Sequence, residues 1–291
     1  MPTQYTFEAI GTHWVIDIHD VITKEQSDNL HTQIMERIAL FDAHYSRFRP
    51  DSLISEVART PGSYQLPSDA EPMLGLYHTL YRITNGAFTP LIGQALSDAG
   101  YDAHYSLQGK KLSAPPTWDE ALIYNYPTLI TKLPVLIDVG AAGKGYLIDI
   151  VSELIEQAGI QTYTVDAGGD MRHRTEAPEP LKVGLENPAD TSQVIGIAHI
   201  MNQSLCGSAG NRRAWGNFHH ILDPHSLTSP THIAALWTIA DTTLLADALS
   251  TCLFFVPPAT LLKHYTFEYL ILQSDFTVTM SPNFPAQLFT A

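Results

Sequence analysis

Residues 243–254, TLLADALSTCLF, contain one acidic side chain in an otherwise apolar or small-residue segment, and Thr251 follows Asp247 at a spacing of four. On a helix these two residues lie on one face about one turn apart, so their oxygens can reach the same point in space, which could hold a hard cation. The alternative is structural: Asp247 bonds a neighbouring loop, and Thr251 bonds its own i−4 carbonyl. Because a carboxylate removed from water without a partner is costly, a buried helix here requires either a donor or a metal.

Two glycine-containing segments have the composition of ligand-binding loops. In DVGAAGKGY, residues 138–146, the glycines let backbone amides approach an anion, and Lys144 adds a positive charge. The segment is not a Walker A motif, because Gly145 stands where that motif needs Ser or Thr and because the glycine spacing differs. In DAGGDMR, residues 166–172, a strand ends at two glycines and an acid, as in a sharp turn or a close approach to a ligand. For each segment, a ligand loop and a structural turn both stay open.

Basic and imidazole side chains follow in the next part of the chain. SAGNRR, residues 208–213, is a small polar turn whose two arginines either face a phosphate or form a solvated pair. FHHILDPHS, residues 218–226, places His219 and His220 side by side in a predicted strand. Because neighbours on a strand point to opposite faces, only one of the two can point into a site, and a structural role is the alternative for both.

The elements that must position these residues follow from hydrophobic periodicity. Residues 5–20 alternate and are rich in β-formers, which predicts a strand pair folded about Gly11. Residues 24–46 carry an apolar stripe at helical spacing, and residues 69–86 predict a second helix that ends at Asn85 and Gly86. The other predicted elements are a strand, turn and helix over 134–159, a helix over 243–256, and strands within 107–133, 162–170, 181–188, 195–201, 219–224, 234–240 and 269–273.

Strands and helices therefore interleave without a regular βαβ period or an internal repeat. The stripe of the first helix consists of Leu30, Ile34, Ile38 and Phe41. With no composition break strong enough to mark a boundary, the sequence predicts one mixed α/β (α+β) domain over residues 1–291.

Composition limits the classes of partner. The 291 residues are 45% hydrophobic and 16% charged, which is typical of a globular chain with a sizeable core. Thirty acids against sixteen bases give a formal charge of −14, which argues against nucleic acid or an anionic membrane as a non-specific partner. Cys206 and Cys252 lack the spacing of a zinc site, and we expect both to be reduced.

The first residues contain no basic segment followed by an apolar one, no lipid-attachment cysteine lies near the start, and no run of 18 apolar residues predicts a transmembrane segment. These features favour a cytoplasmic protein, or a periplasmic one if an export signal has been removed.

Taken in order, these motifs resemble the ApbE family of flavin transferases, which move FMN from FAD onto a Ser or Thr of an acceptor protein. Five stretches carry the likeness along nearly the full length of the chain. They are IGTHW (10–14), SRFRPDSLISEV (46–57), GAFTPLIG (86–93), the segment from DVGAAGKGYLID to DAGGD (138–170), and SAGNRR, HHILDP and ADALST near the end. The resemblance implies an ApbE-like, T-fold-like architecture.

The resemblance also implies roles for individual residues. Asp247, Thr251 and the main-chain carbonyl of Ala141 would bind Mg²⁺, and His220 would be the base that takes the proton of the acceptor hydroxyl. The residues implied for FAD binding are Ile10, Phe48, Ala87, Phe88, Thr89, Asp138, Lys144 and Leu222. The chain departs from the usual family pattern at positions 10, 48 and 89, where Met, Tyr and Asp are typical.

The implied reaction is Mg²⁺-dependent transfer of FMN from FAD to a Ser or Thr hydroxyl of an acceptor flavoprotein, with AMP as the leaving group. Two alternatives stay open: an FAD pyrophosphatase, in which water replaces the hydroxyl and gives free FMN and AMP, and a flavin-binding protein without turnover. The departures at positions 10, 48 and 89 keep the last alternative open, whereas intact Asp247, Thr251, Lys144 and His220 argue against it.

Overall fold

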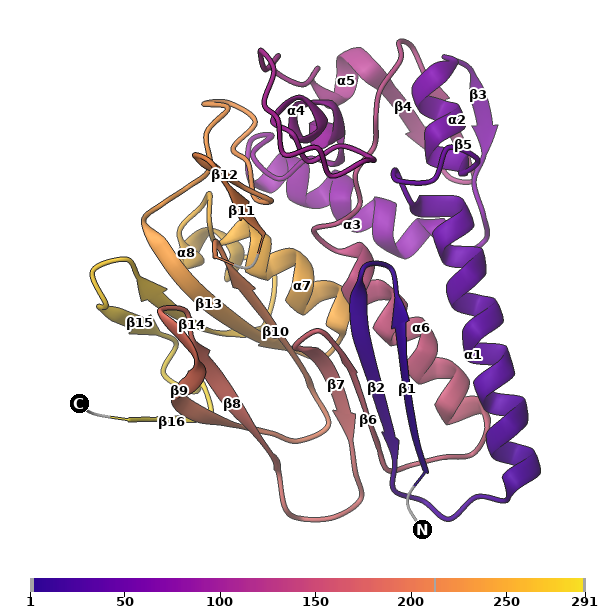
Figure 1. Ribbon diagram of the computed structural model, residues 1–291, viewed down its shortest axis with the longest axis vertical. Coiled ribbons are helices and arrows are strands. Elements are labelled where there is room, and N and C mark those ends of the chain that lie inside the picture. Colours follow the sequence, from indigo (N-terminus) through magenta and orange to yellow (C-terminus); the bar gives the residue numbers. More distant parts are fainter. Residues whose placement is uncertain (1–2, 212, 290–291) are drawn as a thin grey trace.

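The computed structural model describes residues 3–211 and 213–289, and its strands and helices interleave along the chain as the sequence predicts (Figure 1). The predicted strand pair is present as β1 (Thr3–Ala9) and β2 (Thr12–Ile18). Ile10 and Gly11 join the two strands at positive φ angles of 45° and 73°. Such angles are easy for glycine and unusual for isoleucine, so the turn holds Ile10 in a strained backbone conformation.

The largest sheet has eight strands in the order β1-β2-β6-β7-β10-β13-β14-β15, and each neighbouring pair is antiparallel. The remaining strands of this sheet are β6 (Tyr163–Ala167), β7 (Asp170–Arg174), β10 (Ser204–Ala209), β13 (Ile233–Ala240), β14 (Glu268–Gln273) and β15 (Val278–Met280).

Three small sheets accompany it in the described part of the chain. One contains β8 (Leu181–Asn187), β9 (Asp190–Ile200) and β16 (Ala286–Leu288). Another contains β3 (Ser63–Gln65), β4 (Leu122–Asn125) and β5 (Thr128–Thr131), and a hairpin contains β11 (Ala214–Trp215) and β12 (Phe218–His219).

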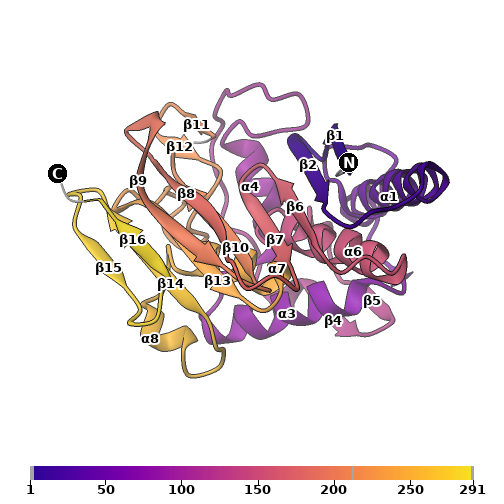
Figure 2. The same ribbon diagram turned by 90° about the horizontal axis from the view of Figure 1, so that it is seen from below.

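Helices α6 and α7 pack against one face of the large sheet, with α1 packed on α6, and the β8–β9–β16 sheet packs against the other face (Figure 2). The long helices are α1 (Lys24–Tyr45), α3 (Ala70–Ile83), α6 (Gly143–Gln157) and α7 (Thr243–Cys252). The short ones are α2 (Leu53–Arg59), η1 (Pro90–Ile92), α4 (Gly93–Asp98), α5 (Trp118–Ala121) and α8 (Pro258–Leu261).

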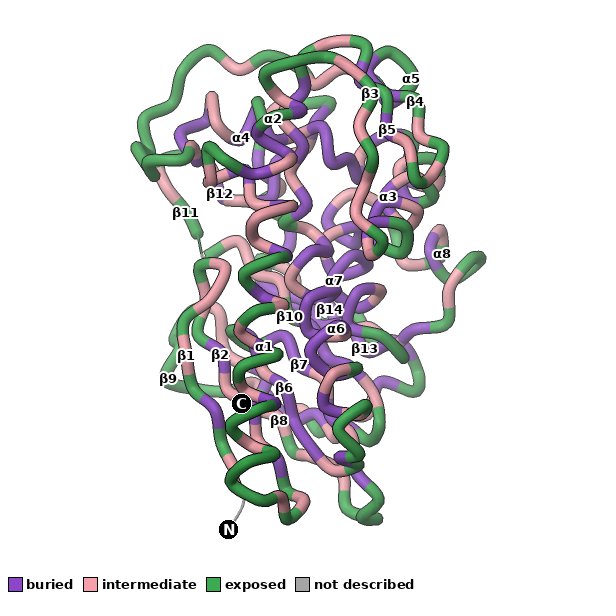
Figure 3. The backbone as a smooth tube through the Cα atoms, turned by 90° about the vertical axis from the view of Figure 1, so that its right-hand side faces the viewer, coloured by how far each residue is buried: buried purple, intermediate pink, exposed green. Residues whose placement is uncertain are grey.

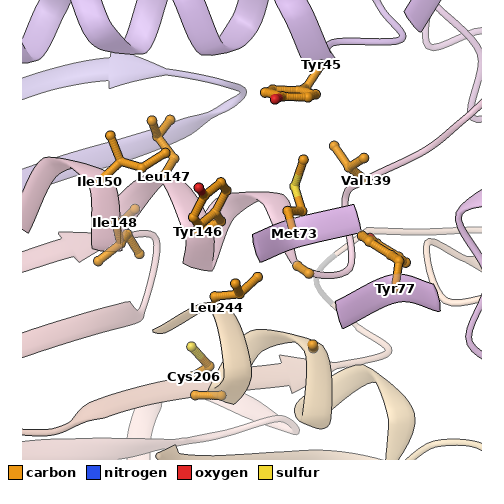
Figure 4. Packing of buried hydrophobic residues seen from close by; sticks show 14 of the residues in the cluster. Tyr45, Met73, Tyr77, Val139, Tyr146, Leu147, Ile148, Ile150, Cys206 and Leu244 are labelled. Atoms are coloured by element: carbon orange, nitrogen blue, oxygen red, sulfur yellow. The ribbon is translucent and has the colours of Figure 1, made fainter. Parts of the chain in front are cut away.

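The main core lies between the sheet and these helices. Buried residues gather along α6, α7 and the central strands, whereas α1 exposes its outer side (Figure 3). Figure 4 shows Tyr45 of α1, Tyr77 of α3 and Leu147 of α6 in this core. The apolar stripe predicted for α1 is buried, because Leu30, Ile34, Ile38 and Phe41 are each at most 4% exposed. Burial of this stripe stabilises a helix that would be marginal alone.

The structure corrects three predicted strands. Residues 134–139 form no ladder; the segment runs over the core, with Val135, Ile137 and Val139 buried, and the Asp138 N–H donates to the Pro90 carbonyl at 2.7 Å. The strand predicted over 219–224 ends at His219, because a turn closed between Asp223 and Thr228 follows it.

The strand predicted over 162–170 is instead the start of a hairpin. Gly168 and Gly169 turn the chain at φ angles of 64° and 94°, and β7 returns along β6. Strands β7 and β10 were not predicted, because DMRHR and SLCGSA have no apolar alternation. Strands were predicted within residues 107–133, and β4 and β5 are present there, whereas residues 120–121 belong to α5. Within the described ranges, no helix is long and apolar enough to cross a membrane.

Candidate active site

One cavity of about 1060 Å³ opens between the helices, the β1–β2 turn and the β8–β9–β16 sheet. All twelve residues singled out from the sequence line it: Ile10, Phe48, Ala87, Phe88, Thr89, Asp138, Ala141, Lys144, His220, Leu222, Asp247 and Thr251. A cavity of this size is large enough for a dinucleotide-sized ligand. The fold therefore brings together residues that are up to 241 positions apart, although their individual roles stay predictions.

The floor of the cavity is formed where the N-terminal turns of α6 and α7 cross. An Asp247 Oδ2 atom accepts a hydrogen bond of 2.8 Å from the Gly145 N–H in the first turn of α6. The helices approach so closely that a Cβ atom on Gly145 would lie 2.3 Å from the Thr243 carbonyl oxygen. Only glycine permits this approach, which explains the residue that separates the loop from a Walker A motif.

Asp247 is a buried carboxylate whose main described partner is a backbone amide. The side chain is part of none of the ion pairs between described residues. Burial is the main reason why the pKa of Asp247 is raised, although Lys144 and the Gly145 N–H oppose the shift. One hydrogen bond compensates only part of the cost of burying a negative charge, so this position favours a bound cation.

The chemistry of the surrounding donors fits a hard cation. Thr251 and Ala141 are half-buried in the wall of the same cavity, so carboxylate, hydroxyl and carbonyl oxygens are all available. Among residues 3–211 and 213–289, no three His, Cys, Asp or Glu side chains group to hold a metal. An oxygen set with one carboxylate is typical of Mg²⁺ that shares its coordination with substrate phosphates, and it is poorly suited to zinc.

Lys144 is not a free positive charge in the phosphate-type loop. Its Nζ atom forms an ion pair with Asp170, whose side chain is only 2% exposed. The other Asp170 oxygen accepts a hydrogen bond of 3.0 Å from the Gly207 N–H. Asp170 lines the cavity and was not predicted as a site residue, although the acid that ends DAGGD was the available signal. Asp170 holds the ammonium group at the cavity wall and offsets its charge.

A second ion pair lies in the cavity wall at the start of the glycine loop. Arg47, whose side chain is 3% exposed, pairs with Asp138. The remaining Asp138 oxygen accepts a hydrogen bond of 2.7 Å from the Gly140 N–H, which fixes the start of the glycine loop. The Arg47 guanidinium also lies 4.2 Å from the Phe48 ring centroid and 4.9 Å from that of Tyr101. Arg47 thus ties the loop to aromatic rings at the cavity mouth.

The mouth itself is aromatic. The Tyr105 ring stacks on Phe48 with centroids 5.3 Å apart and planes 12° apart, and Tyr101 stacks on Trp215 at 5.6 Å. Arg213 donates to the Tyr101 hydroxyl at 2.9 Å, so this member of the predicted arginine pair lies at the mouth, whereas Arg212 lies outside the described residues. Tyr101 and Tyr105 were not singled out from the sequence, because their segment has no legible period. Stacked rings of this kind suit a planar aromatic ligand.

The remaining predicted flavin residues differ in how much of each side chain is available. Phe88 and Leu222 are buried at 2% and 4% exposure, and Phe88 stacks on Tyr77 at 4.8 Å. The Thr89 hydroxyl accepts the Leu91 N–H at 3.2 Å and caps η1. Ile10 and Ala87 are half-buried. These residues shape the cavity wall mainly through apolar surface.

His219 and His220 occupy different environments. The His219 ring is bonded at both nitrogens, with Nε2 donating to the Pro230 carbonyl at 2.9 Å and Nδ1 accepting from the Ile221 N–H at 3.2 Å. His220 lines the cavity, and its buried Nδ1 has no hydrogen-bond partner in the described structure. His220 lies beyond the end of β12, so the alternation of a strand does not apply to it, and the two hydrogen bonds of the His219 ring make that histidine a structural residue.

Burial, aided by nearby Arg213, lowers the pKa of His220 to about 3. The imidazole is therefore neutral at physiological pH and has a lone pair available for a proton. Negative charge brought into the cavity by a ligand would raise this pKa and make the ring a better base.

Comparison with known proteins identifies the family and the fold of the chain. The ApbE family model matches residues 10–270. The FAD:protein FMN transferase of Haemophilus influenzae is 26% identical, with 91% of this chain and 84% of that protein covered. The FAD:protein FMN transferase of Escherichia coli K12 is 24% identical over 97% of this chain and 88% of that protein.

Solved structures share the fold over almost the full length. The ApbE protein of Thermotoga maritima superimposes with a TM-score of 0.85 at 20% identity, covering 99% of this chain and all (100%) of that one. The flavin transferase ApbE of Vibrio cholerae gives a TM-score of 0.81 at 19% identity, covering 98% of each chain. The mixed α/β architecture is thus that of ApbE proteins, and the chain, matched by the family model over residues 10–270, belongs to the ApbE family.

Proposed function

We propose that this protein is an FAD:protein FMN transferase that uses Mg²⁺ and modifies a Ser or Thr hydroxyl of an acceptor protein. The observation that carries the proposal is Asp247, a buried carboxylate that forms no ion pair with any described residue, set beside the N-terminal turn of α6 in a cavity with an aromatic mouth. The names of the matched relatives support the same activity. Residues 1–291 are proposed to act as one catalytic domain.

The polar floor and the aromatic mouth of the cavity favour one orientation of FAD. The pyrophosphate would lie at the floor, where the N-terminal turn of α6 favours negative charge and where Lys144, although its charge is offset by Asp170, adds an N–H donor. The isoalloxazine ring belongs at the mouth, beside Phe48 and Tyr105. Asp247, Thr251 and the Ala141 carbonyl would hold Mg²⁺, which would polarise the phosphorus and neutralise charge on the leaving oxygen.

The transfer step then requires one proton acceptor. The acceptor hydroxyl attacks the phosphorus of the FMN half, and its proton passes to the neutral His220 ring. The bond between that phosphorus and the bridging oxygen breaks, and AMP leaves with the bridging oxygen on its phosphate. Lys144, fixed by Asp170, stays near the phosphates throughout. His220 has no competing partner at Nδ1 within the described residues, which is consistent with a ring kept free for this role.

Two other outcomes use the same site. If water occupies the place of the acceptor hydroxyl, the products are free FMN and AMP. If neither reacts, the protein only binds flavin. The cytoplasmic location expected from the sequence, and the Ser or Thr target, remain predictions.

The decisive assay incubates the protein with FAD and Mg²⁺, with and without an acceptor protein, and follows AMP by chromatography and covalent flavin by in-gel fluorescence. We expect AMP in amounts equal to bound flavin only when the acceptor is present. AMP and free FMN without acceptor would identify a pyrophosphatase, and no AMP under any condition would leave a binding protein.

The role of His220 is tested in the same assay. The variant His220→Gln should lose flavin transfer about 10²- to 10⁴-fold, the usual contribution of a positioned general base, while FAD and metal binding persist. His264→Gln, at an exposed position away from the cavity, is the matched control. Unchanged transfer in His220→Gln would remove this residue from the mechanism.

A further inference from the structure

Helices α6 and α7 cap each other through two carboxylates. Asp149, in the second turn of α6, accepts hydrogen bonds from the Thr243 N–H at 2.9 Å and the Leu244 N–H at 2.8 Å, the first two amides of α7. In return, Asp247 of α7 accepts the Gly145 N–H in the first turn of α6. Amides in the first turn of a helix have no partner within the helix, so each carboxylate satisfies donors that the other helix leaves free.

The arrangement around Asp149 is fixed on several sides. The Thr242 hydroxyl accepts the Leu245 N–H at 3.3 Å, so the first three amides of α7 all have partners. Arg172 lies 3.7 Å from the Asp149 carboxyl and donates to the Asp241 carbonyl at 2.7 Å. Asp149 and Arg172 therefore hold the start of α7 from two directions.

Both Asp149 oxygens are used by these amides, so the residue is not itself available to a cation. Its effect is on the position of α7 relative to α6. Asp247 and Thr251 lie on α7, whereas Ala141 lies in the loop that leads into α6, and the two parts are joined at the crossing of the helices. A helix that slides by one residue moves 1.5 Å along its axis, whereas Mg²⁺ requires oxygens at about 2.0–2.1 Å in near-ideal geometry.

We propose that Asp149 is a positioning residue that sets α7 against α6, so that Asp247 and Thr251 meet the Ala141 carbonyl at the distance a divalent cation requires. The inference rests on the proposed function for the identity of the metal site, but it concerns metal affinity and not turnover. Partners that orient metal ligands without binding the metal typically contribute 10- to 100-fold to affinity.

The test measures binding of Mn²⁺ alone by electron paramagnetic resonance, in wild type, Asp149→Ala, Asp149→Asn and Arg172→Met, each well below its unfolding temperature. We expect Asp149→Ala to bind Mn²⁺ at least 10-fold more weakly than wild type. Asp149→Asn retains one acceptor oxygen and should lie between them, and Arg172→Met should weaken binding less than Asp149→Ala.

A buried core variant controls for general loss of stability. Ile148 is fully buried one residue away on α6, so Ile148→Val should lower the unfolding temperature without changing Mn²⁺ affinity. Equal Mn²⁺ affinity in wild type and both Asp149 variants, or an equal loss in Ile148→Val, would overturn the proposal. If Asp149→Ala does not fold, the Asp149→Asn and Arg172→Met results decide.

Failure of the proposed function gives a different pattern. If wild type binds Mn²⁺, Asp149 variants bind it weakly and no AMP is formed from FAD, the positioning role stands and the transferase proposal fails. If Asp247→Asn leaves Mn²⁺ affinity unchanged, the metal is elsewhere and the positioning role fails with it.

Discussion

The floor and the mouth of the cavity are built on different principles. At the floor, polar groups bond one another across α6 and α7, and Gly145 leaves no room for a side chain. At the mouth, the Phe48 and Tyr105 rings stack, the Tyr101 ring meets both of them edge-on, and Tyr105 is 52% exposed. A floor of directional hydrogen bonds tolerates little change, whereas stacked rings can adjust to a ligand.

The loop that presents Tyr105 shows how the mouth is held. Asp102 accepts hydrogen bonds from the His104 and Ser106 amides and from the Ser106 hydroxyl, which lowers its pKa to about 2. Tyr105 and Leu107 adopt positive φ angles of 50° and 53°. The loop is thus shaped by hydrogen bonds within residues 102–106 and not by packing against the core. Under the proposed function, we expect the floor to determine the chemistry and the mouth to determine ligand recognition.

Replacing the charge at the floor should have the largest effect. Asp247→Asn retains an oxygen that can accept the Gly145 N–H, so the helices stay in place, but it removes the negative charge assigned to the metal. We expect Mg²⁺-dependent AMP release to fall by orders of magnitude while the unfolding temperature is held or rises, because the buried charge is gone. Asp247→Ala also leaves the Gly145 N–H unpaired and should be less stable. Wild-type AMP release in Asp247→Asn would end the metal assignment.

The helix crossing can be broken without touching any polar group. In Gly145→Ala, the new Cβ would lie 2.3 Å from the Thr243 carbonyl oxygen and 2.7 Å from the Asp247 Cβ, so α7 must move away. Overpacking of this kind typically destabilises a protein by 1–3 kcal/mol, so we expect the free energy of unfolding to fall by about that amount. Metal binding should weaken as well, because α7 carries two of the proposed ligands.

Gly75→Ala in α3 is the matched control for this substitution. Its Cβ would meet no atom within 4 Å, so the same change in a helix with open space should stabilise by about 0.4–1 kcal/mol. Denaturant unfolding of the two variants measures the contrast. If Gly145→Ala is as stable as Gly75→Ala, the floor is less constrained than its geometry indicates.

This difference also explains which parts could be predicted from the sequence. Asp247 and Thr251 were found because helical spacing is regular, and α7 does place both at the cavity. Asp149 and Asp170 act through contacts with residues 94 and 37 positions away, Thr243 and Gly207, and no local pattern announces such pairs. The strand expected at 134–139 failed because an apolar β-type run can also be buried as an irregular segment.

The lowered pKa of His220 predicts a pH dependence of stability. Because the folded protein holds this imidazole neutral down to about pH 3, only the unfolded chain takes up its proton as the pH falls below 6.5. Folding is therefore penalised on the acid side, and between pH 7 and 5 this single group should cost about 2 kcal/mol of unfolding free energy. In denaturant unfolding, His220→Gln should lose about 2 kcal/mol less unfolding free energy than wild type between pH 7 and 5. The exposed variant His264→Gln should follow wild type. Parallel curves for all three proteins would place the His220 ring in water.

A substitution at the mouth should have the smallest effect, and it should strengthen FAD binding. Phe48 stacks on Tyr105 and lies 4.2 Å from the Arg47 guanidinium, yet it is only half-buried, so Phe48→Tyr can add a hydroxyl without forcing an unpaired polar group into the core. One neutral hydrogen bond contributes about 0.5–1.5 kcal/mol, which corresponds to roughly two- to tenfold tighter FAD binding. Isothermal titration calorimetry measures this directly, and AMP titrated in the same way is the control ligand, whose affinity should not change because it lacks the isoalloxazine ring. Weaker FAD binding in Phe48→Tyr would show that the ring is packed as core, and a matching change for AMP would mean that the mouth does not distinguish the two ends of FAD.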